Sequence, residues 1–178
     1  MKYWEKMRGK GQSPPGVSLS EVFWSWLGAF SGIALVALLH YKLLDQLGMQ
    51  LLMASLGASA VLLYGAIRSP LAQPRNVLGG HVLSAIVGVS AYQLLGAYPW
   101  LAAAMAVSLA IALMHLTRTL HPPGGATALI AVIGGESVHN LGYWFVLMPV
   151  GLGALVMVIV AVLVNNLAEN RKYPEFWL

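Results

Sequence analysis

The chain of 178 residues contains no cysteine and few charged side chains. Charged residues make up 9% of the sequence, and only six are acidic. The absence of cysteine excludes disulfide bonds and thiolate metal sites. No histidine pair stands at metal-binding helical spacing, no Ser/His/Asp set is visible and acidic residues are scarce in the apolar segments, so we expect neither a metal nor an enzyme active site. We also expect no cofactor.

Hydrophobic residues, by contrast, make up 58% of the chain. Apolar stretches can be drawn at 22–40, 49–67, 76–97, 98–117, 122–135 and 142–164. Most approach the ~20 residues that a membrane-spanning helix needs, and 122–135 is the clear exception. The sequence therefore predicts an all-α membrane helix bundle of about six transmembrane segments over 21–165, between an N-terminal segment 1–20 and a tail 166–178.

The basic residues indicate how the helices are oriented. The net charge is +4, but these residues lie in the ends and loops, as in membrane proteins, so we expect no nucleic-acid partner. Six crossings with a cytoplasmic N-terminus place only Lys42 outside and put nine basic residues inside: Lys2, Lys6, Arg8, Lys10, Arg68, Arg75, Arg118, Arg171 and Lys172. Four crossings would leave six basic residues inside and four outside. The positive-inside rule favours six crossings with both termini cytoplasmic. We expect Ser18 or Ser20 to cap the first helix.

The run 121–128 (HPPGGATA) interrupts the apolar pattern with two prolines and two glycines. Non-helical backbone at membrane depth is tolerated only where it is buried in protein or lines a polar cavity. Prolines suit the first turn of a helix, and a helix start offers unpaired amides and partial positive charge to an anion. We expect the amides of Gly124, Gly125 and Ala126 to bind a small anion, with a hydroxyl from Thr127. The alternative is that these small residues serve only close helix packing.

A weak internal repeat gives this run a counterpart. Residues 57–62 (GASAVL) match residues 125–130 (GATALI) at a constant offset, each in the middle of three apolar segments. Three crossings per half predict two inverted repeats, 21–97 and 98–165, with broken or half helices near 55–59 and 121–127 and a site at their interface. The predicted binding residues are His121, Pro122, Pro123, Gly124, Gly125, Ala126, Thr127, Ser55, Gly57, Ala58 and Ser59.

Polar residues near one membrane face form a second group of candidates. Arg68, Arg75 and Asn76 belong to a proline-bounded loop, which the six-crossing topology places beside Arg118. Clustered cations can concentrate an anion at a pore mouth, although they also serve simply to fix orientation. We expect His81 to share this role of anion attraction or gating. His81 and His121 are also candidates for coupling the substrate to protons. The alternative is that both rings are buried and merely hydrogen-bonded.

Three runs in order, LGASAVLL at 56–63, SPLAQPRNVLGGH at 69–81 and HPPGGATAL at 121–129, resemble the HPP family of integral membrane proteins. The resemblance covers about residues 20–165. It implies a multi-spanning protein, and relatives in cyanobacteria and chloroplasts have been linked to nitrite transport. Some relatives carry soluble regulatory domains after the last helix, and regulation through such a domain is not expected here.

Together these observations predict a transporter or channel for a small inorganic anion, with nitrite as the first expectation. We expect it in the lipid bilayer of a bacterial inner (plasma) membrane, as a homo-oligomer whose second copy seals the sides of the short helices. A carrier of another small solute, such as nitrate, formate or a neutral molecule, and a structural subunit without a transport path remain alternatives.

Overall fold

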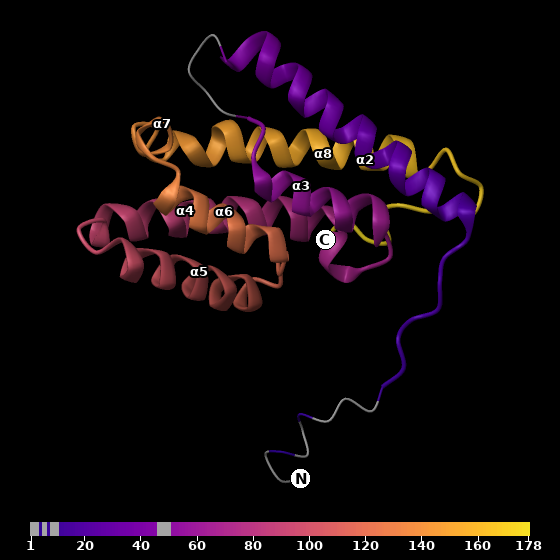
Figure 1. The fold of residues 1–178 in the computed structure, drawn as a ribbon, viewed down its shortest axis with the longest axis horizontal. Helices are drawn as coiled ribbons and strands as arrows, with labels where there is room; N and C mark the ends of the chain where they lie inside the picture. The colour runs from indigo at the N-terminus through magenta and orange to yellow at the C-terminus, as the bar shows by residue number, and fades with distance from the viewer. Residues whose placement is uncertain (1–3, 5–6, 8–10, 46–50) are drawn as a thin grey trace.

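The computed structural model describes residues 4, 7, 11–45 and 51–178, and every regular element in these ranges is helical (Figure 1). Lys2, Lys6, Arg8 and Lys10, and the start of the expected segment 49–67, lie outside the described residues. The elements are α2 (Leu19–Leu39), the π-helical turn η1 (His40–Leu44), α3 (Ala54–Ala60), the π-helical turn η3 (Val61–Gly65), the 3-10 turn η4 (Pro70–Ala72), α4 (Pro74–Leu95), α5 (Pro99–Leu116), α6 (Pro122–Ile133), α7 (Glu136–His139), the π-helical turn η5 (Val146–Gly151) and α8 (Leu152–Asn165).

Four of the helical segments are long and apolar enough to cross a membrane: Leu19–Leu44, Pro74–Leu95, Pro99–Leu116 and Val146–Asn165. The expectation of a helical membrane protein is therefore confirmed. The other two expected segments form the shorter apolar helices Ala54–Gly65 and Pro122–Ile133. With 12 residues, α6 is about 18 Å long, against a hydrocarbon core of about 30 Å.

Contacts at the helix ends show that α4 and α5 run in opposite directions, as do α2 and α8. At one end of the bundle, the side chain of Arg75, at the start of α4, reaches Thr117 after α5, and Arg171, after α8, reaches Glu21 at the start of α2. At the other end, the ring of Tyr92 near the end of α4 stacks on His139 of α7. The start of α2 and the end of α8 therefore lie at the same end of the bundle, which we call the terminal end.

Local sequence signals explain where the helices begin. Ser18 caps α2 by accepting a hydrogen bond from the Glu21 amide at 3.2 Å, as expected. Pro74, Pro99 and Pro122 each occupy the first turn of a helix, where the missing N–H costs nothing and the fixed φ favours helical geometry.

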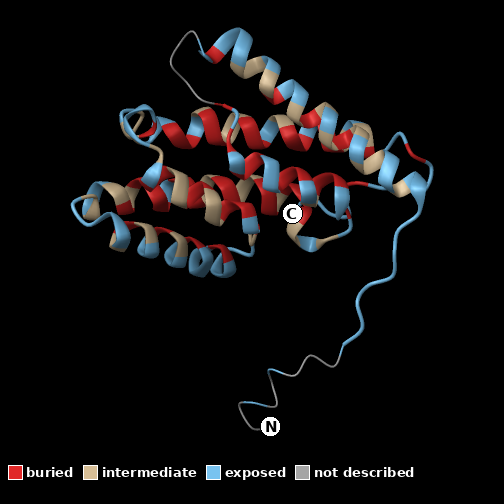
Figure 2. Cartoon of the chain, viewed as in Figure 1, coloured by how far each residue is buried: buried red, intermediate tan, exposed pale blue. Residues whose placement is uncertain are grey.

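Small residues allow α4, α5 and α6 to pack closely. A Cβ added to Gly88 of α4 would lie 2.6 Å from the Ala128 carbonyl oxygen of α6. On α5 the buried positions Ala102, Ala106 and Ala110 recur every four residues. This small-residue spacing is typical of membrane helices. The outer faces of α2 and α5 are largely exposed (Figure 2) and carry large apolar side chains such as Phe30 and Leu109, as expected of surfaces that face lipid.

Tyr64 joins the first half of the chain to α8. Its ring is fully buried against Gly28 and Gly32 of α2, and its hydroxyl donates a hydrogen bond to the Met157 carbonyl at 3.1 Å. A side chain at either glycine would collide with the ring. In Figure 1, α2 and α5 form opposite edges of the bundle, and α3 lies between them.

Candidate functional site

Four polar side chains meet in the interior where α3, α4 and α6 pack together. Ser59 comes from α3, His81 from α4, Thr127 from α6, and His121 is the residue immediately before α6. All four are fully buried. Ionisable residues in transmembrane segments are rare and usually functional, so this His–Ser–His–Thr cluster is the candidate site.

The cluster is a continuous chain of hydrogen bonds. Ser59 Oγ lies 2.7 Å from Nε2 of His81 and 2.8 Å from Nε2 of His121. Nδ1 of His81 lies 2.7 Å from Thr127 Oγ1, and Nδ1 of His121 lies 2.8 Å from the carbonyl oxygen of Leu71. The two imidazole centroids are 5.0 Å apart.

The Leu71 carbonyl determines the direction of every bond when both rings are neutral. A carbonyl only accepts, so His121 carries its hydrogen on Nδ1 and its Nε2 accepts from the Ser59 hydroxyl. Having donated, Ser59 accepts from Nε2–H of His81, whose Nδ1 then accepts from the Thr127 hydroxyl. Every ring nitrogen is thus paired without a charge or a water molecule.

Glycines on α4 and α6 bring the two histidines together. A Cβ on Gly80, next to His81, would lie 2.6 Å from His121 Cβ. A Cβ on Gly124 would lie 2.7 Å from Ser84 Oγ and 2.9 Å from the Gly80 carbonyl oxygen. Gly124 of the HPPGG run therefore packs against α4, as the packing alternative expects. Gly125 differs, because its nearest neighbour would be 3.9 Å away.

The start of α6 offers few free amides. Pro122 and Pro123 have no N–H, and the Gly124 amide donates to the His121 carbonyl at 2.8 Å. The Gly124 amide is thus engaged within the chain, and anion binding at Gly124, Gly125 and Ala126 stays a prediction. The hydroxyl expected from Thr127 does lie in the cluster.

The predicted counterpart on α3 divides between two faces of the helix. Ser55 and Ser59 are buried on the inner face, whereas Gly57 and Ala58 are exposed on the outer face. The structure therefore does not bring Gly57 and Ala58 to the cluster. Ser55 Oγ is fully buried and has no hydrogen-bond partner among the described residues.

The arginines and the asparagine predicted to attract or gate an anion lie at two different places at the terminal end. Arg75 and Asn76 donate to the carbonyls of Thr117 and Leu120, so they hold the turn that leads into His121. Arg118 lies in that turn with a positive φ of 57° and is exposed. Arg68 instead lines a cavity.

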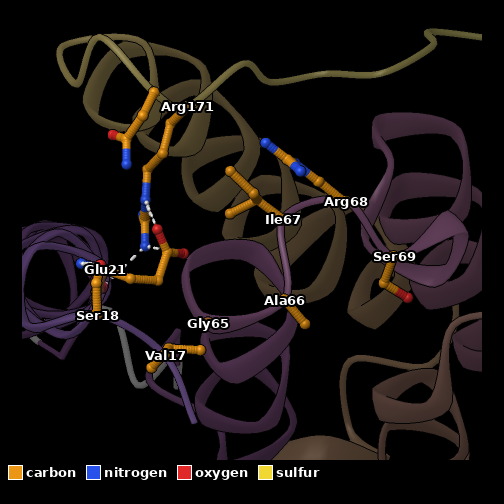
Figure 3. Close-up of a pocket in the computed structure, with 10 residues that line it drawn as sticks. Val17, Ser18, Glu21, Gly65, Ala66, Ile67, Arg68, Ser69 and Arg171 are labelled. Carbon is orange, nitrogen blue, oxygen red and sulfur yellow. Dashed lines mark hydrogen bonds and ion pairs between the residues drawn. The ribbon is translucent and has the colours of Figure 1, made fainter. Parts of the chain in front are cut away.

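This cavity of about 500 Å³ opens at the terminal end (Figure 3). Arg68 extends into it toward Arg171, whose guanidinium contacts both Glu21 carboxylate oxygens, at 2.6 and 3.1 Å. Arg171 is therefore compensated in charge, and no hydrogen bond or ion pair engages Arg68 among the described residues. The cavity is not lined by any of the four cluster residues.

Sequence reasoning missed how the C-terminal tail closes this end. Tyr173 is buried, its hydroxyl donates to the Ala72 carbonyl at 2.8 Å, and burial raises the pKa of this hydroxyl. Arg171 also donates to Ser25 and Asn165. These contacts join positions up to 150 residues apart, and no local motif in the tail indicates them.

The fold and the buried cluster define a helical membrane protein with a histidine–hydroxyl site between two short helices. The family model for the HPP transmembrane region matches residues 14–174, and the chain belongs to this family, as its motifs indicate. It is 47% identical over 180 residues to one transmembrane protein of Dictyostelium discoideum and 46% identical over 183 residues to another. These alignments cover 99% of this chain but 58% and 64% of the relatives. No solved structure matches the chain.

Proposed function

We propose that this chain is a membrane transporter for a small inorganic anion, with nitrite as the leading substrate, and that it has no enzymatic activity. The proposal rests on one observation, the buried cluster of Ser59, His81, His121 and Thr127. Polar and ionisable side chains are costly to bury inside a membrane even when they are paired, so a cluster of this kind is rarely kept for packing alone. The nitrite assignment comes from the family resemblance.

The chemistry of the cluster suits a small oxyanion. Hydroxyl and imidazole N–H groups donate to anions, and the orphan hydroxyl of Ser55 lies one helical turn from Ser59. Because the cluster is saturated in this conformation, an incoming anion has to replace one of its internal bonds. We therefore favour a carrier that opens and closes around the cluster over a permanently open pore.

The arrangement of the helices supports alternating access. Ser59 and Thr127 are equivalent in the repeated runs, and each also lies close to the carbonyl four residues earlier, that of Ser55 or Pro123. Two short helices of opposite direction that meet at one site resemble the inverted repeats of secondary transporters. We propose the terminal end as the cytoplasmic side of a plasma membrane, and a homo-oligomer that covers the short helices.

Flux measurements with purified protein in liposomes test the function. We expect nitrite uptake above that of empty vesicles, strongly reduced by Ser59→Ala and by His81→Gln. Ser108→Ala and His115→Gln are matched controls, because both residues are exposed on α5, and they should leave flux unchanged.

Failure of the wild-type protein to move nitrite at both pH 6 and pH 8 would contradict the proposal. Competition by nitrate and formate, and uptake of a neutral solute, distinguish another substrate. Absence of flux for the whole panel would favour a structural subunit.

A further inference from the structure

Each hydroxyl of the cluster has a second hydrogen-bond acceptor within its own helix. Ser59 Oγ is 3.1 Å from the carbonyl oxygen of Ser55, and Thr127 Oγ1 is 3.4 Å from that of Pro123. In the neutral chain described above, both hydroxyl hydrogens point to ring nitrogens instead. Rotation about one C–O bond would redirect either hydrogen to the helix carbonyl without moving a heavy atom.

These second acceptors allow the rings to gain a proton. If Nε2 of His121 is protonated, it becomes a donor, and the Ser59 hydroxyl has to turn away. Ser59 then donates to the Ser55 carbonyl and accepts from both Nε2–H groups. If Nδ1 of His81 is protonated, Thr127 likewise turns to the Pro123 carbonyl and accepts from the ring. Both ring pairings therefore survive protonation.

Among the described residues, the groups around the cluster offer no counter-charge to a protonated ring. His81 contacts Ser59 of α3, Thr127 of α6 and His121, which is the one titratable group among its contacts in the described residues. Tyr64, on the turn after α3, directs its hydroxyl to Met157. Within the described part of the chain no carboxylate hydrogen-bonds to the cluster, and the side chain of Glu175, in the tail that binds Gln73, is exposed.

We propose that His81 and His121 form a proton-binding site, in which the Ser59 and Thr127 hydroxyls rotate between a ring nitrogen and a helix carbonyl. The pair takes one proton, because a second charge 5.0 Å away would be repelled. We further infer, as an extension that rests on the proposed function, that the oxyanion binds beside this charge. Proton and anion would then enter together.

Nitrogen NMR of the two rings tests the proton site without any substrate. His40→Gln, His115→Gln and His139→Gln leave only the two cluster histidines for ¹⁵N labelling in lipid nanodiscs, and His81→Gln assigns the signals. At alkaline pH we expect His81 to carry its hydrogen on Nε2 and His121 on Nδ1. On acidification, one ring should become protonated at both nitrogens. The opposite tautomers, or rings that stay neutral down to the lowest pH of the folded protein, would overturn the proposal.

Two variants separate rotation of a hydroxyl from packing. Thr127→Ser keeps the hydroxyl, whereas Thr127→Val keeps the shape and removes the acceptor for a protonated Nδ1 of His81. We expect proton uptake on His81 to persist in the serine variant and to be lost in the valine variant. If Thr127 served only packing, proton uptake on His81 would persist in the valine variant and be impaired in the serine variant, because valine fills the space better than serine.

A pH-sensitive dye inside nitrite-loading liposomes tests the coupling. Internal acidification that follows nitrite entry and is lost in Thr127→Val supports joint movement, measured against the dye response of empty vesicles. Ring titration without nitrite flux would refute the proposed function and leave the proton site intact. Nitrite flux without ring titration would refute the proton site alone.

Discussion

Ser59 and Thr127, which occupy equivalent positions of the two repeated runs, hydrogen-bond to opposite nitrogens of the same imidazole, His81, at 2.7 Å each. One ring on α4 therefore connects α3 to α6. Because the Leu71 carbonyl fixes the direction of the chain, each hydroxyl donates to one ring, and Ser59 also accepts from another. Loss of the Ser59 hydroxyl consequently breaks two bonds of the chain.

Ser59→Ala should destabilise the protein more than removal of an ordinary serine. It leaves the His81 Nε2–H and the His121 Nε2 without partners inside the bundle. Each buried group left unpaired costs about 1–3 kcal/mol, so for the two groups we expect a total loss of roughly 2–6 kcal/mol. Thermal unfolding in detergent measures it, with the exposed Ser108→Ala as control. Equal melting temperatures for the two variants would show that the hydrogen-bond chain does not stabilise the fold.

The two glycines of the HPPGG run should respond oppositely to alanine. At Gly124 the new methyl would meet the Gly80 carbonyl at 2.9 Å and force α4 and α6 apart, at a cost of about 1–3 kcal/mol. At Gly125 the nearest atom is 3.9 Å away, and alanine favours helix by about 1 kcal/mol. Gly124→Ala should therefore lower the melting temperature, and Gly125→Ala should keep or raise it. Similar losses in both variants would contradict this packing.

The helix positions were largely predictable because apolar length and proline placement determine them. The ranges expected from the sequence overlap the four long and the two shorter apolar helices of the described residues, and Pro74, Pro99 and Pro122 start helices as prolines should. The site was less predictable. Its histidine before α6 stood in a conspicuous motif, whereas the central position of His81 depends on how α4 packs against two helices.

Helical geometry explains why the predicted residues of α3 divide between two faces. Ser55 and Ser59 are four residues apart and share a face, whereas Gly57 lies about 200° around the helix from Ser55. Only the inward positions of the repeated run can therefore reach the interior of the bundle. The return of the tail through Tyr173 involves contacts 101 residues apart, which no local pattern could indicate.

The tail depends on the ion pair between Arg171 and Glu21. The Arg171 side chain is 1% exposed, and that of Glu21 is 26% exposed. Glu21→Gln removes the charge partner but leaves Ser25 and Asn165 in place, so we expect a loss of about 1–3 kcal/mol. Limited proteolysis of the tail should become faster than in the exposed control Glu169→Gln. Unchanged proteolysis would show that the pair does not hold the tail.

The tail should also loosen at alkaline pH. Burial, followed by the nearby Tyr64, raises the pKa of Tyr173 above its ordinary value of about 10. The unfolded state therefore releases its proton first, and the contribution of the neutral hydroxyl to stability is present below pH ~10 and declines above it. Tyr173→Phe should flatten this decline, measured by unfolding across the alkaline range. The exposed Tyr98→Phe should not change it.

Arg68 and Arg75 should affect anion transport in different ways. Arg68 lines the open cavity without a partner among the described residues, whereas Arg75 holds the Thr117 carbonyl at 3.0 Å. If Arg68 draws anions to the terminal end, Arg68→Gln should reduce the initial rate of nitrite flux several-fold at low ionic strength. The difference from wild type should vanish in high salt, because salt screens exposed charges over about 10 Å or less.

Arg75→Gln provides the contrast, because it loosens the turn before His121 and should lower both flux and thermal stability at every salt concentration. A salt-independent loss in Arg68→Gln would instead assign Arg68 a structural role. Equal flux of Arg68→Gln and wild type at low salt would exclude this cavity as the entrance for the anion. Both arginines carry the same positive charge. The comparison of the two variants therefore distinguishes long-range attraction of the anion by Arg68 from the local hydrogen bond that Arg75 makes to Thr117.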